Sequence, residues 1–201
     1  MKNITKKLVK VLVLVLFVGI GVFAFGAWSA LAHNCTGAAG ETCNCGGTSN
    51  DFEDCTDCTT ALDVAGDGAT VLLDENITDQ AGHCIDDPIN FTNKIFDCQG
   101  NTIDGDGTAG TFGIYLANKD NNTIKNCVIT QFDYGIYLYL FSNNNTLTNN
   151  TAKDNNDGIV LLGSSNYNTL TSNTANNNNY GIYLSNSSNN TLNSNTVKDN
   201  N

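Results

Sequence analysis

The sequence predicts an all-β fold, a right-handed parallel β-helix, because two motifs recur with one period along its C-terminal half. The first motif begins with Gly-Ile and recurs after 22, 23 and 23 residues, at Gly113, Gly135, Gly158 and Gly181. The second is Asn-Thr followed by Ile or Leu, and it recurs after 23, 23 and 22 residues, at Asn122, Asn145, Asn168 and Asn190. Short alternating stretches between clusters of Asn, Asp, Ser and Gly are typical of strands joined by tight turns. Each period therefore predicts one coil of 22–23 residues.

Stacking such coils brings equivalent residues to about 4.7–4.9 Å from one another, so the inward side chains form columns. Four apolar columns follow from the two motifs. They are Ile114, Ile136, Ile159 and Ile182; Leu116, Leu138, Leu161 and Leu184; Ile124, Leu147, Leu170 and Leu192; and Ile129, Ala152, Ala175 and Val197. We expect these columns to be the core.

Asparagine is unusually frequent in the same region, with 21 asparagines among the 59 residues 143–201. Such a composition is by itself typical of low-complexity disorder. However, Asn150, Asn173 and Asn195 fall three residues after the third apolar column, where stacked amides can hydrogen-bond to one another and to the backbone. Because the columns keep phase with these asparagines, the pattern favours an ordered asparagine ladder at a turn.

Upstream of the repeats, Lys94–Cys98 aligns with Thr123–Cys127. We therefore expect the first coil to begin near Asn90, to carry a short insertion at 101–105 and to place Cys98 and Cys127 in one ladder.

The domain boundaries that follow are a cysteine-rich segment at 33–62, an N-terminal cap and first coil at 63–112, and regular coils at 113–201. Incoming strands and a cap are expected because an open coil exposes unpaired strand edges. The pattern predicts another Gly-Ile soon after Asn201, so we expect a β-helix that is truncated at its C-terminal side.

Residues 1–32 differ from the rest, with four lysines followed by an uncharged apolar run at 11–27 and small residues at 30–32. This arrangement predicts an export signal peptide or, if it is not cleaved, an N-terminal membrane anchor. The remainder is therefore expected outside the cytoplasm, as a secreted, periplasmic or cell-surface protein that meets a membrane only through this segment.

Eight cysteines behind an export signal predict disulfides, because compartments beyond the membrane do not keep thiols reduced. All eight are candidates: Cys35, Cys43, Cys45, Cys55, Cys58, Cys84, Cys98 and Cys127. The spacing of Cys43 from Cys45 and of Cys55 from Cys58 also resembles that of zinc ligands. For Cys98 and Cys127, stacked free thiols are an alternative to a bridge, because ladder side chains point in parallel.

The charge limits the partners that the exported part can bind. Four of the nine basic residues, all lysines, lie in residues 1–32, so the five that remain against 20 acidic residues leave a formal charge of −15 from His33 onward. Nucleic acids and anionic lipid headgroups are bound by clustered Lys and Arg, so we expect neither as a partner.

The stretch Phe96-Asp-Cys-Gln-Gly-Asn-Thr-Ile-Asp-Gly105 and the repeated Gly-Ile-Tyr-Leu and Asn-Asn-Thr-Leu units resemble the β-helix repeats of NosD-like periplasmic proteins and of the wider pectin-lyase-like superfamily. The resemblance covers about residues 58–201 and implies a parallel β-helix. It implies little about activity, since the superfamily includes polysaccharide lyases and hydrolases, carbohydrate-binding modules, surface proteins and a copper-site maturation factor.

The residues that those enzymes use are not clustered in the sequence. Hydrolases of this fold use aspartates on neighbouring coils, but the positions that match Asp154 and Asp157 in adjacent coils are Gln131, Tyr134, Asn177 and Tyr180. We therefore interpret these two aspartates as solvated turn residues and predict no catalytic residues in this span.

We predict no metal site or cofactor either. Copper needs imidazole or soft sulfur ligands, whereas the chain has two histidines, His33 and His83, and its only methionine is the initiator. Asp104-Gly-Asp-Gly107 offers oxygen ligands for calcium but lacks the spacing of a calcium loop, so it is read as a tight turn.

Tyr115, Tyr137 and Tyr183 alternate with the inward Ile and Leu columns and are expected to point outward from one sheet, with Val160 interrupting the row. Exposed rings can stack on sugars or pack on a partner, or they can simply stabilise parallel strands. The sequence therefore predicts a non-enzymatic module that binds a polysaccharide or a cell-envelope component. The alternatives are a structural stalk and the N-terminal part of a polysaccharide lyase or glycoside hydrolase whose catalytic coils lie beyond residue 201.

Overall fold

The computed structural model describes residues 34–46 and 51–201, and the predicted signal or anchor at 1–32 and His33 lie outside them. Within the described residues, no helix has both the length and the apolar character needed to cross a membrane. The described residues belong to one compact unit.

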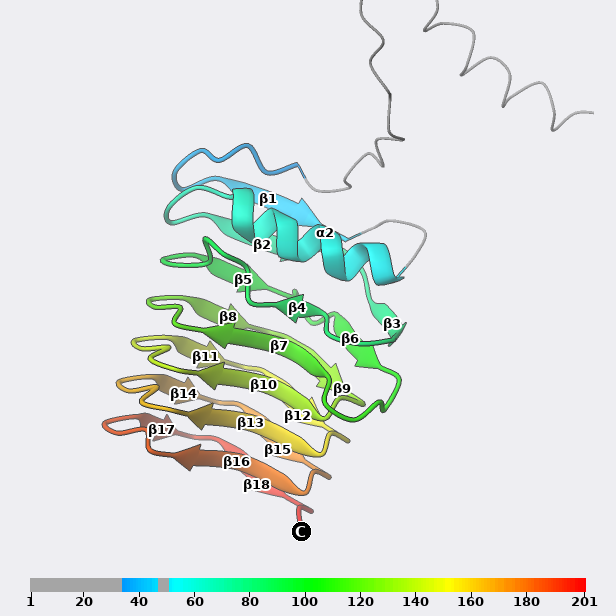
Figure 1. Cartoon of the computed structure of the whole chain (residues 1–201), viewed down its shortest axis with the longest axis vertical. Helices are drawn as coiled ribbons and strands as arrows, with labels where there is room; N and C mark the ends of the chain where they lie inside the picture. Colours follow the sequence, from blue (N-terminus) through cyan, green and yellow to red (C-terminus); the bar gives the residue numbers. More distant parts are fainter. Residues whose placement is uncertain (1–33, 47–50) are drawn as a thin grey trace, which may run out of the picture. The chain divides into compact units, whose positions relative to one another are not determined.

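Three parallel sheets run along the stack of coils (Figure 1). The first sheet contains β1 (Thr42–Cys45), β2 (Thr70–Leu73), β5 (Ile95–Asp97), β8 (Thr123–Lys125), β11 (Thr146–Thr148), β14 (Thr169–Thr171) and β17 (Thr191–Asn193). The second contains β3 (Ile77–Gln80), β6 (Thr102–Gly105), β9 (Val128–Thr130), β12 (Thr151–Lys153), β15 (Thr174–Asn176) and β18 (Thr196–Lys198). The third contains β4 (Ile85–Asp86), β7 (Phe112–Ala117), β10 (Tyr134–Tyr139), β13 (Asp157–Leu162) and β16 (Tyr180–Ser185).

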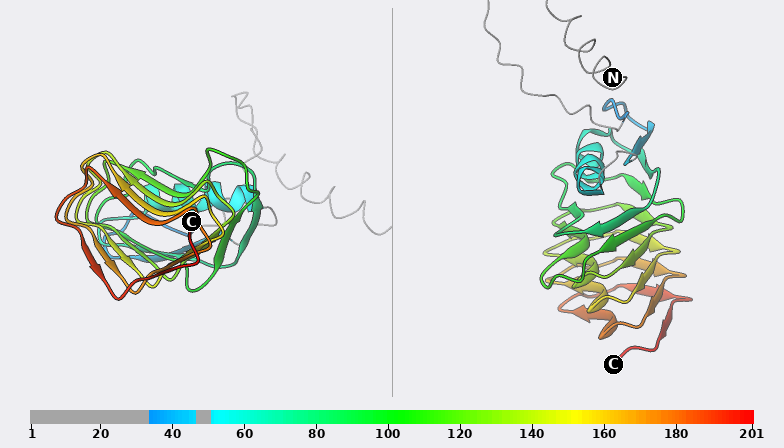
Figure 2. Two further views of the ribbon diagram at one scale, coloured as in Figure 1. Left: turned by 90° about the horizontal axis from the view of Figure 1, so that it is seen from below. Right: turned by 90° about the vertical axis from the view of Figure 1, so that its right-hand side faces the viewer.

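Each coil passes through the first, second and third sheets in that order, and the coils superpose when they are viewed along the stack (Figure 2). This arrangement confirms the predicted parallel β-helix.

All four predicted apolar columns are confirmed. Ile114, Ile136 and Ile159 pair in register across β7, β10 and β13, and all three are fully buried. The column of Ile124, Leu147 and Leu170 pairs in the same way across the first sheet. Burial ends with the last coil, where Leu192 is 48% exposed and Val197 is 52% exposed. The core is therefore a continuous stack of aliphatic side chains.

The predicted asparagine ladder is one of three, because a buried asparagine follows each sheet at its corner. In each ladder the side-chain Oδ1 accepts a hydrogen bond from the backbone N–H of the equivalent residue one coil earlier. Its Nδ2 donates to a backbone carbonyl of that earlier coil. At Asn173, for example, Oδ1 accepts from Asn150 N at 3.0 Å and Nδ2 donates to Leu147 O at 2.9 Å. The ladders are Asn122, Asn145, Asn168 and Asn190; Asn150, Asn173 and Asn195; and Asn155, Asn178 and Asn200.

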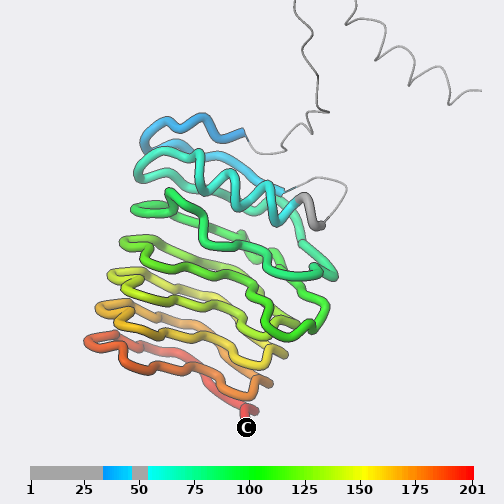
Figure 3. The backbone as a smooth tube through the Cα atoms, viewed as in Figure 1, coloured from blue at the N-terminus to red at the C-terminus, as the bar shows by residue number. Residues whose placement is uncertain are grey.

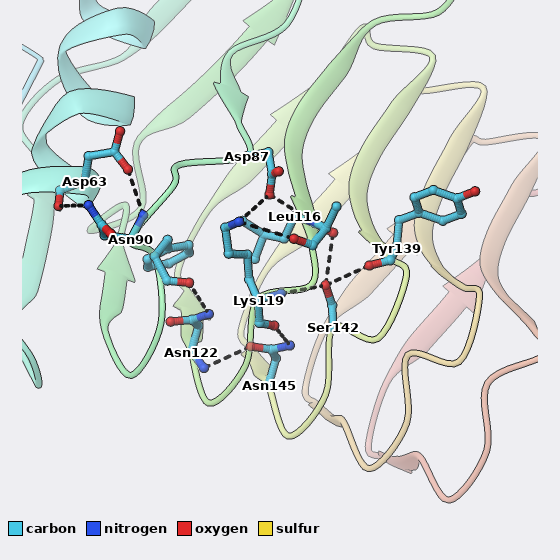
Figure 4. A network of polar contacts seen from close by, with 11 residues as sticks. Asp63, Asp87, Asn90, Leu116, Lys119, Asn122, Tyr139, Ser142 and Asn145 are labelled. Carbon is cyan, nitrogen blue, oxygen red and sulfur yellow. Dashed lines mark hydrogen bonds and ion pairs between the residues drawn. The ribbon is translucent and has the colours of Figure 1, made fainter.

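Figure 4 shows the first of these corners, between the third and first sheets. Asn122 N donates to Asn145 Oδ1 at 2.9 Å, and Asn145 Nδ2 donates to Lys119 O at 2.8 Å. Beside them, the Ser142 hydroxyl contacts the carbonyls of Leu116 and Tyr139 at 3.1 and 2.9 Å. Backbone N–H and C=O groups that lie in the turn cannot pair within a sheet, and side chains form hydrogen bonds with them instead.

The residue before each ladder position has a left-handed backbone, which asparagine and aspartate adopt more easily than other non-glycine residues. Asn149 has a φ of 55°, Asn144 of 56° and Asp154 of 56°, and each precedes a ladder asparagine. Each corner therefore uses polar residues twice, once for the turn and once for the ladder. This double use explains why the chain is so rich in asparagine without being disordered.

The repeat length varies between 22 and 23 residues because the loop at one corner of the coil varies in length. Five residues separate Tyr139 from Asn145, whereas only four separate Ala117 from Asn122, although both pairs of end points are in register. The extra residue lies at the corner between the third and first sheets, so the strands keep their register while the loop changes.

The upstream alignment was wrong by one residue. Ile95 pairs with Thr123 and Phe96 with Ile124, so Phe96 is the fully buried side chain and Ile95 is only partly buried. Residues 101–105 are also not an insertion, because Thr102–Gly105 forms β6 and Ile103 lies over Ile129. The first complete coil begins at Thr70, earlier than Asn90. Figure 3 shows the path of the backbone through the successive coils.

Helix α2 (Asp51–Val64) begins in the cysteine-rich segment and extends two residues beyond it. It packs against the end of the stack, where β1, β3 and β4 are the last strands of the three sheets (Figure 1). Its buried apolar side chains recur at helical spacing: Cys55, Cys58, Ala61, Leu62 and Ala65 just beyond its end. Lys94 Nζ donates to Leu62 O at 2.7 Å, which places a cation at the negative end of the helix dipole. The helix covers the end of the coil stack, where strand edges would otherwise be open.

All eight cysteines form disulfides: Cys35–Cys43, Cys45–Cys58, Cys55–Cys84 and Cys98–Cys127. The zinc alternative is therefore wrong, since no cysteine sulfur is free to bind a metal. The free-thiol alternative is wrong too. Cys127 occupies a ladder position, because its N–H donates to Asn150 Oδ1 at 3.1 Å, and the bridge to Cys98 continues the coil-to-coil link covalently.

Replacing Asn173 by alanine tests the ladder. The change leaves the buried Asn150 N–H and Leu147 carbonyl without the partner that the side chain supplies, at about 1–3 kcal/mol for each buried group. We expect the free energy of unfolding in urea to fall by at least about 2 kcal/mol. Asn156→Ala, at an exposed position one coil earlier, is the matched control, and an equal loss in both variants would contradict the ladder's role.

Candidate functional site

Outward side chains of the third sheet form three rows that run along the stack. The row that contains the predicted tyrosines is Tyr115, Tyr137, Val160 and Tyr183, in register as expected. On one side of it lies the row Phe112, Tyr134, Asp157 and Tyr180, and on the other Ala117, Tyr139, Leu162 and Ser185. The rows bring six of the chain's seven tyrosines onto one face.

Six rings of this face contact one another and are called the aromatic cluster below. Phe112 is stacked with Tyr115 at 4.9 Å between ring centroids and with Tyr134 at 5.3 Å. Tyr137 lies 5.1–5.6 Å from the rings of Phe112, Tyr115, Tyr134 and Tyr139. His83, just before β4, is stacked on Phe112 at 4.7 Å and completes the cluster. Tyr137 is therefore its centre.

Tyr183, the third predicted tyrosine, lies outside the cluster. It contacts Tyr180 at 5.4 Å, and β13 separates this pair from the other rings. On β13, Val160 is only 1% exposed, so neighbouring side chains cover it. The sequence thus placed the three tyrosines in one row, but the structure brings only Tyr115 and Tyr137 into contact.

Sequence reasoning missed Phe112, Tyr134, Tyr139 and His83. A signal for two of them was present, since Phe112 and Tyr134 stand directly before the glycine of the Gly-Ile motif, as Tyr180 does. Reading the row at that position would have shown the second line of rings. His83 lies in an irregular coil, where the repeat gives no guide.

Most rings of the cluster are half-buried, and burial changes their acidity. Burial raises the pKa of Tyr137 to about 12, with smaller contributions from the neighbouring tyrosines. Burial also raises the pKa of Tyr115 and of Tyr134. The phenol groups therefore stay protonated in neutral solution, where each can both donate and accept a hydrogen bond.

Asp157 corrects the prediction that both aspartates of its turn are solvated. It lies between Tyr134 and Tyr180 in its row, is only 9% exposed, and its Oδ1 has no hydrogen-bond partner within the described part of the chain. Burial raises the pKa of this carboxyl group, and the negative charge of Asp133 raises it further. Asp154 is exposed, as predicted, and accepts a hydrogen bond from Asn177 at 3.2 Å.

Asp104 and Asp106, which the sequence offered as oxygen ligands for calcium but which we read as turn residues, are used within the fold. Asp104 is in β6 and accepts a hydrogen bond from Gln131 at 3.1 Å, and Asp106 accepts one from Thr108 N at 2.9 Å. Hydrogen bonds from the side chain and the backbone of Thr108 lower the pKa of Asp106. In residues 34–46 and 51–201, no group of three or more His, Cys, Asp or Glu side chains is arranged to hold a metal ion.

The fold and the outer face together define the class of this protein: it is a disulfide-bonded parallel β-helix with an aromatic outer face. A family model described as "Periplasmic copper-binding protein (NosD)" matches residues 49–201, and the chain belongs to this family. No curated protein matches the chain, and no solved structure matches it. The family and the four disulfides together place the chain outside the cytoplasm.

The donor set does not fit the copper that the family description mentions. Copper sites use imidazole, thiolate or thioether ligands. Every cysteine is in a disulfide, and His83 is the one histidine among the described residues, where it is stacked on Phe112. We therefore assign no chemistry to copper in this span.

Asp157→Asn tests the burial of this carboxyl group. A raised pKa in the fold means that stability is lost as the pH rises from the ordinary value of 3.8 through the raised value, because the folded state disfavours the charge. The asparagine variant cannot ionise at this position. The difference between its melting temperature and that of the unmodified protein should therefore grow as the pH is raised from 4 to 7. The increase should exceed that of Asp154→Asn, which removes the exposed carboxylate of the same coil; equal trends would show that Asp157 is solvated.

Proposed function

We propose that this chain is a non-enzymatic, extracytoplasmic β-helix module that binds a polysaccharide or another carbohydrate component of a cell envelope through the aromatic cluster. The observation that carries this proposal is the cluster itself: six rings in mutual contact on the outer side of a sheet, half-exposed rather than covered by another element.

Ring faces and phenol groups suit a sugar better than they suit a purely apolar partner. Aromatic faces stack on the apolar faces of sugar rings, and Tyr hydroxyls bond to the sugar hydroxyls at the edge. Because β7 and β10 are fixed by backbone pairing, the rings are held in place before a ligand binds. Such preorganisation lowers the entropic cost of binding.

Charge on the face favours an uncharged saccharide. Asp86 pairs in register with Tyr115, and Asp133 lies next to Tyr134 in the chain. The nearby Lys119 is engaged with Asp87 at 3.2 Å. Uronate or sulfated polymers would be repelled by these carboxylates, whose charges are screened only partly at physiological salt.

The proposal that this module is not an enzyme rests on the residues that flank Asp157 in its row on the third sheet. Glycoside hydrolysis uses two carboxyl groups that flank one bond. The residues that stack above and below Asp157 are Tyr134 and Tyr180, and Oδ1 of Asp157 is buried beneath its neighbours. A carboxyl group in this position is covered by its neighbours and is not presented to a substrate.

Tyr137→Ala is the direct test. Because Tyr137 contacts four other rings, its loss should weaken binding of the best uncharged glycan on a glycan array at least ten-fold, about 1.4 kcal/mol. Tyr137→Phe keeps the ring and should retain most of the binding. Tyr167→Ala, which removes an exposed tyrosine at a corner, is the control.

Two results would contradict the proposal. Full binding by a folded Tyr137→Ala variant would remove the aromatic cluster as the site. Absence of glycan binding by the unmodified protein would favour a structural stalk, in which the rings only stabilise the sheet.

A further inference from the structure

A cavity of about 430 Å³ lies beside the aromatic cluster, between helix α2 and the segment that joins β3 to β4. Its volume is within the range of small-molecule sites. The helix contributes threonines to one wall, and the opposite wall contains a carboxamide, an imidazole and a carboxylate. These polar residues are Thr56, Thr59, Thr60, Gln80, His83 and Asp86.

The cavity and the aromatic cluster share residues. His83 lines the cavity and is stacked on Phe112 at 4.7 Å, so one ring belongs to both. Asp86 lines the cavity and pairs in register with Tyr115, a member of the cluster. A molecule that lies on the cluster can therefore continue directly into the cavity.

The aromatic face ends at this point. The third sheet begins at β4, and α2 is attached just before that strand by the Cys55–Cys84 disulfide and by a hydrogen bond of 3.2 Å from Thr59 Oγ1 to Cys84 O. A chain that follows the rings toward β4 consequently meets the helix. Only its end can enter the space between the helix and the sheet.

Gln80 gives an independent sign that a polar ligand belongs there. Its side chain lines the cavity and is 2% exposed, and its Nε2 donates to Ala81 O at 3.2 Å and to His83 O at 3.0 Å. Its Oε1 is buried without a hydrogen-bond partner among the described residues. Buried acceptors are rarely left unpaired, and a rotation of the Gln80 carboxamide toward the cavity would bring this oxygen to a hydroxyl donor there.

We infer that this cavity is a subsite for the terminal sugar residue of the glycan that lies on the aromatic cluster. The inference rests on the proposed function and adds to it the recognition of a chain end. Threonine hydroxyls, a carboxamide and an imidazole match the hydroxyl groups of an uncharged sugar, and Asp86 accepts hydrogen bonds from them.

The experiment is calorimetric titration of the full chain with mono-, di- and tetrasaccharides of glucan, mannan, galactan and N-acetylglucosamine series. Ala81→Trp places a large side chain at an exposed position that lines the cavity, and Thr60→Phe fills it from the helix. Ala39→Trp, at an exposed turn before β1, is the matched control. Two filling variants on different walls are used so that one misfolded variant does not decide the test.

We expect each folded filling variant to bind the tetrasaccharide at least ten-fold more weakly, with Ala39→Trp unchanged. Methylation of the terminal sugar hydroxyls should weaken binding to the unmodified protein to a similar extent. If the filling variants and the methylated ligand bind normally while Tyr137→Ala does not, the subsite is contradicted and the aromatic cluster stands. If no saccharide of the panel binds the unmodified protein, both the proposed function and the subsite are contradicted.

Discussion

The structure depends on one repeated interaction, the buried asparagine side chain that bonds one coil to the next. At each corner Oδ1 accepts a backbone N–H and Nδ2 donates to a backbone carbonyl of the same neighbouring coil, as at Asn145, Asn173 and Asn178. An aspartate lacks the donor for the second bond. Because the backbone of a corner is turned away from the sheets, these side chains supply the hydrogen bonds that strands make for themselves elsewhere.

The same interaction fixes the candidate site. Three corners hold the regular coils in one register. The outward residues of the third sheet then stack as rows, whether or not their side chains attract one another. Tyr115 over Tyr137 and Phe112 over Tyr134 are consequences of that register. The extra residue in some coils is absorbed at the corner beyond Tyr139 and leaves the rows intact. Helix α2, attached by the Cys55–Cys84 disulfide, then determines where the aromatic face ends.

Where the sequence repeats, it predicted the fold residue by residue, because each column is a period that several coils share. Outside the repeats it did less well, for physical reasons. Besides two cysteines, one alanine and one leucine, helix α2 buries two aspartates, so its apolar stripe is weak in the sequence. Ile95 and Phe96 are both apolar, so alternation could not decide which points inward. The burial of Asp157 depends on neighbouring side chains in space, and the cavity beside His83 depends on a disulfide pairing that spacing does not determine.

Amide hydrogen exchange tests the asparagine ladders most directly. The backbone N–H groups of Asn145, Asn150 and Asn168 donate to the side-chain Oδ1 of the next coil. If these bonds hold the coils together, the three corner amides should exchange as slowly as the strand amide of Leu147, which opens only with the coil as a whole. Exchange of the corner amides at the rate of an unprotected peptide, with Leu147 still protected, would contradict this account.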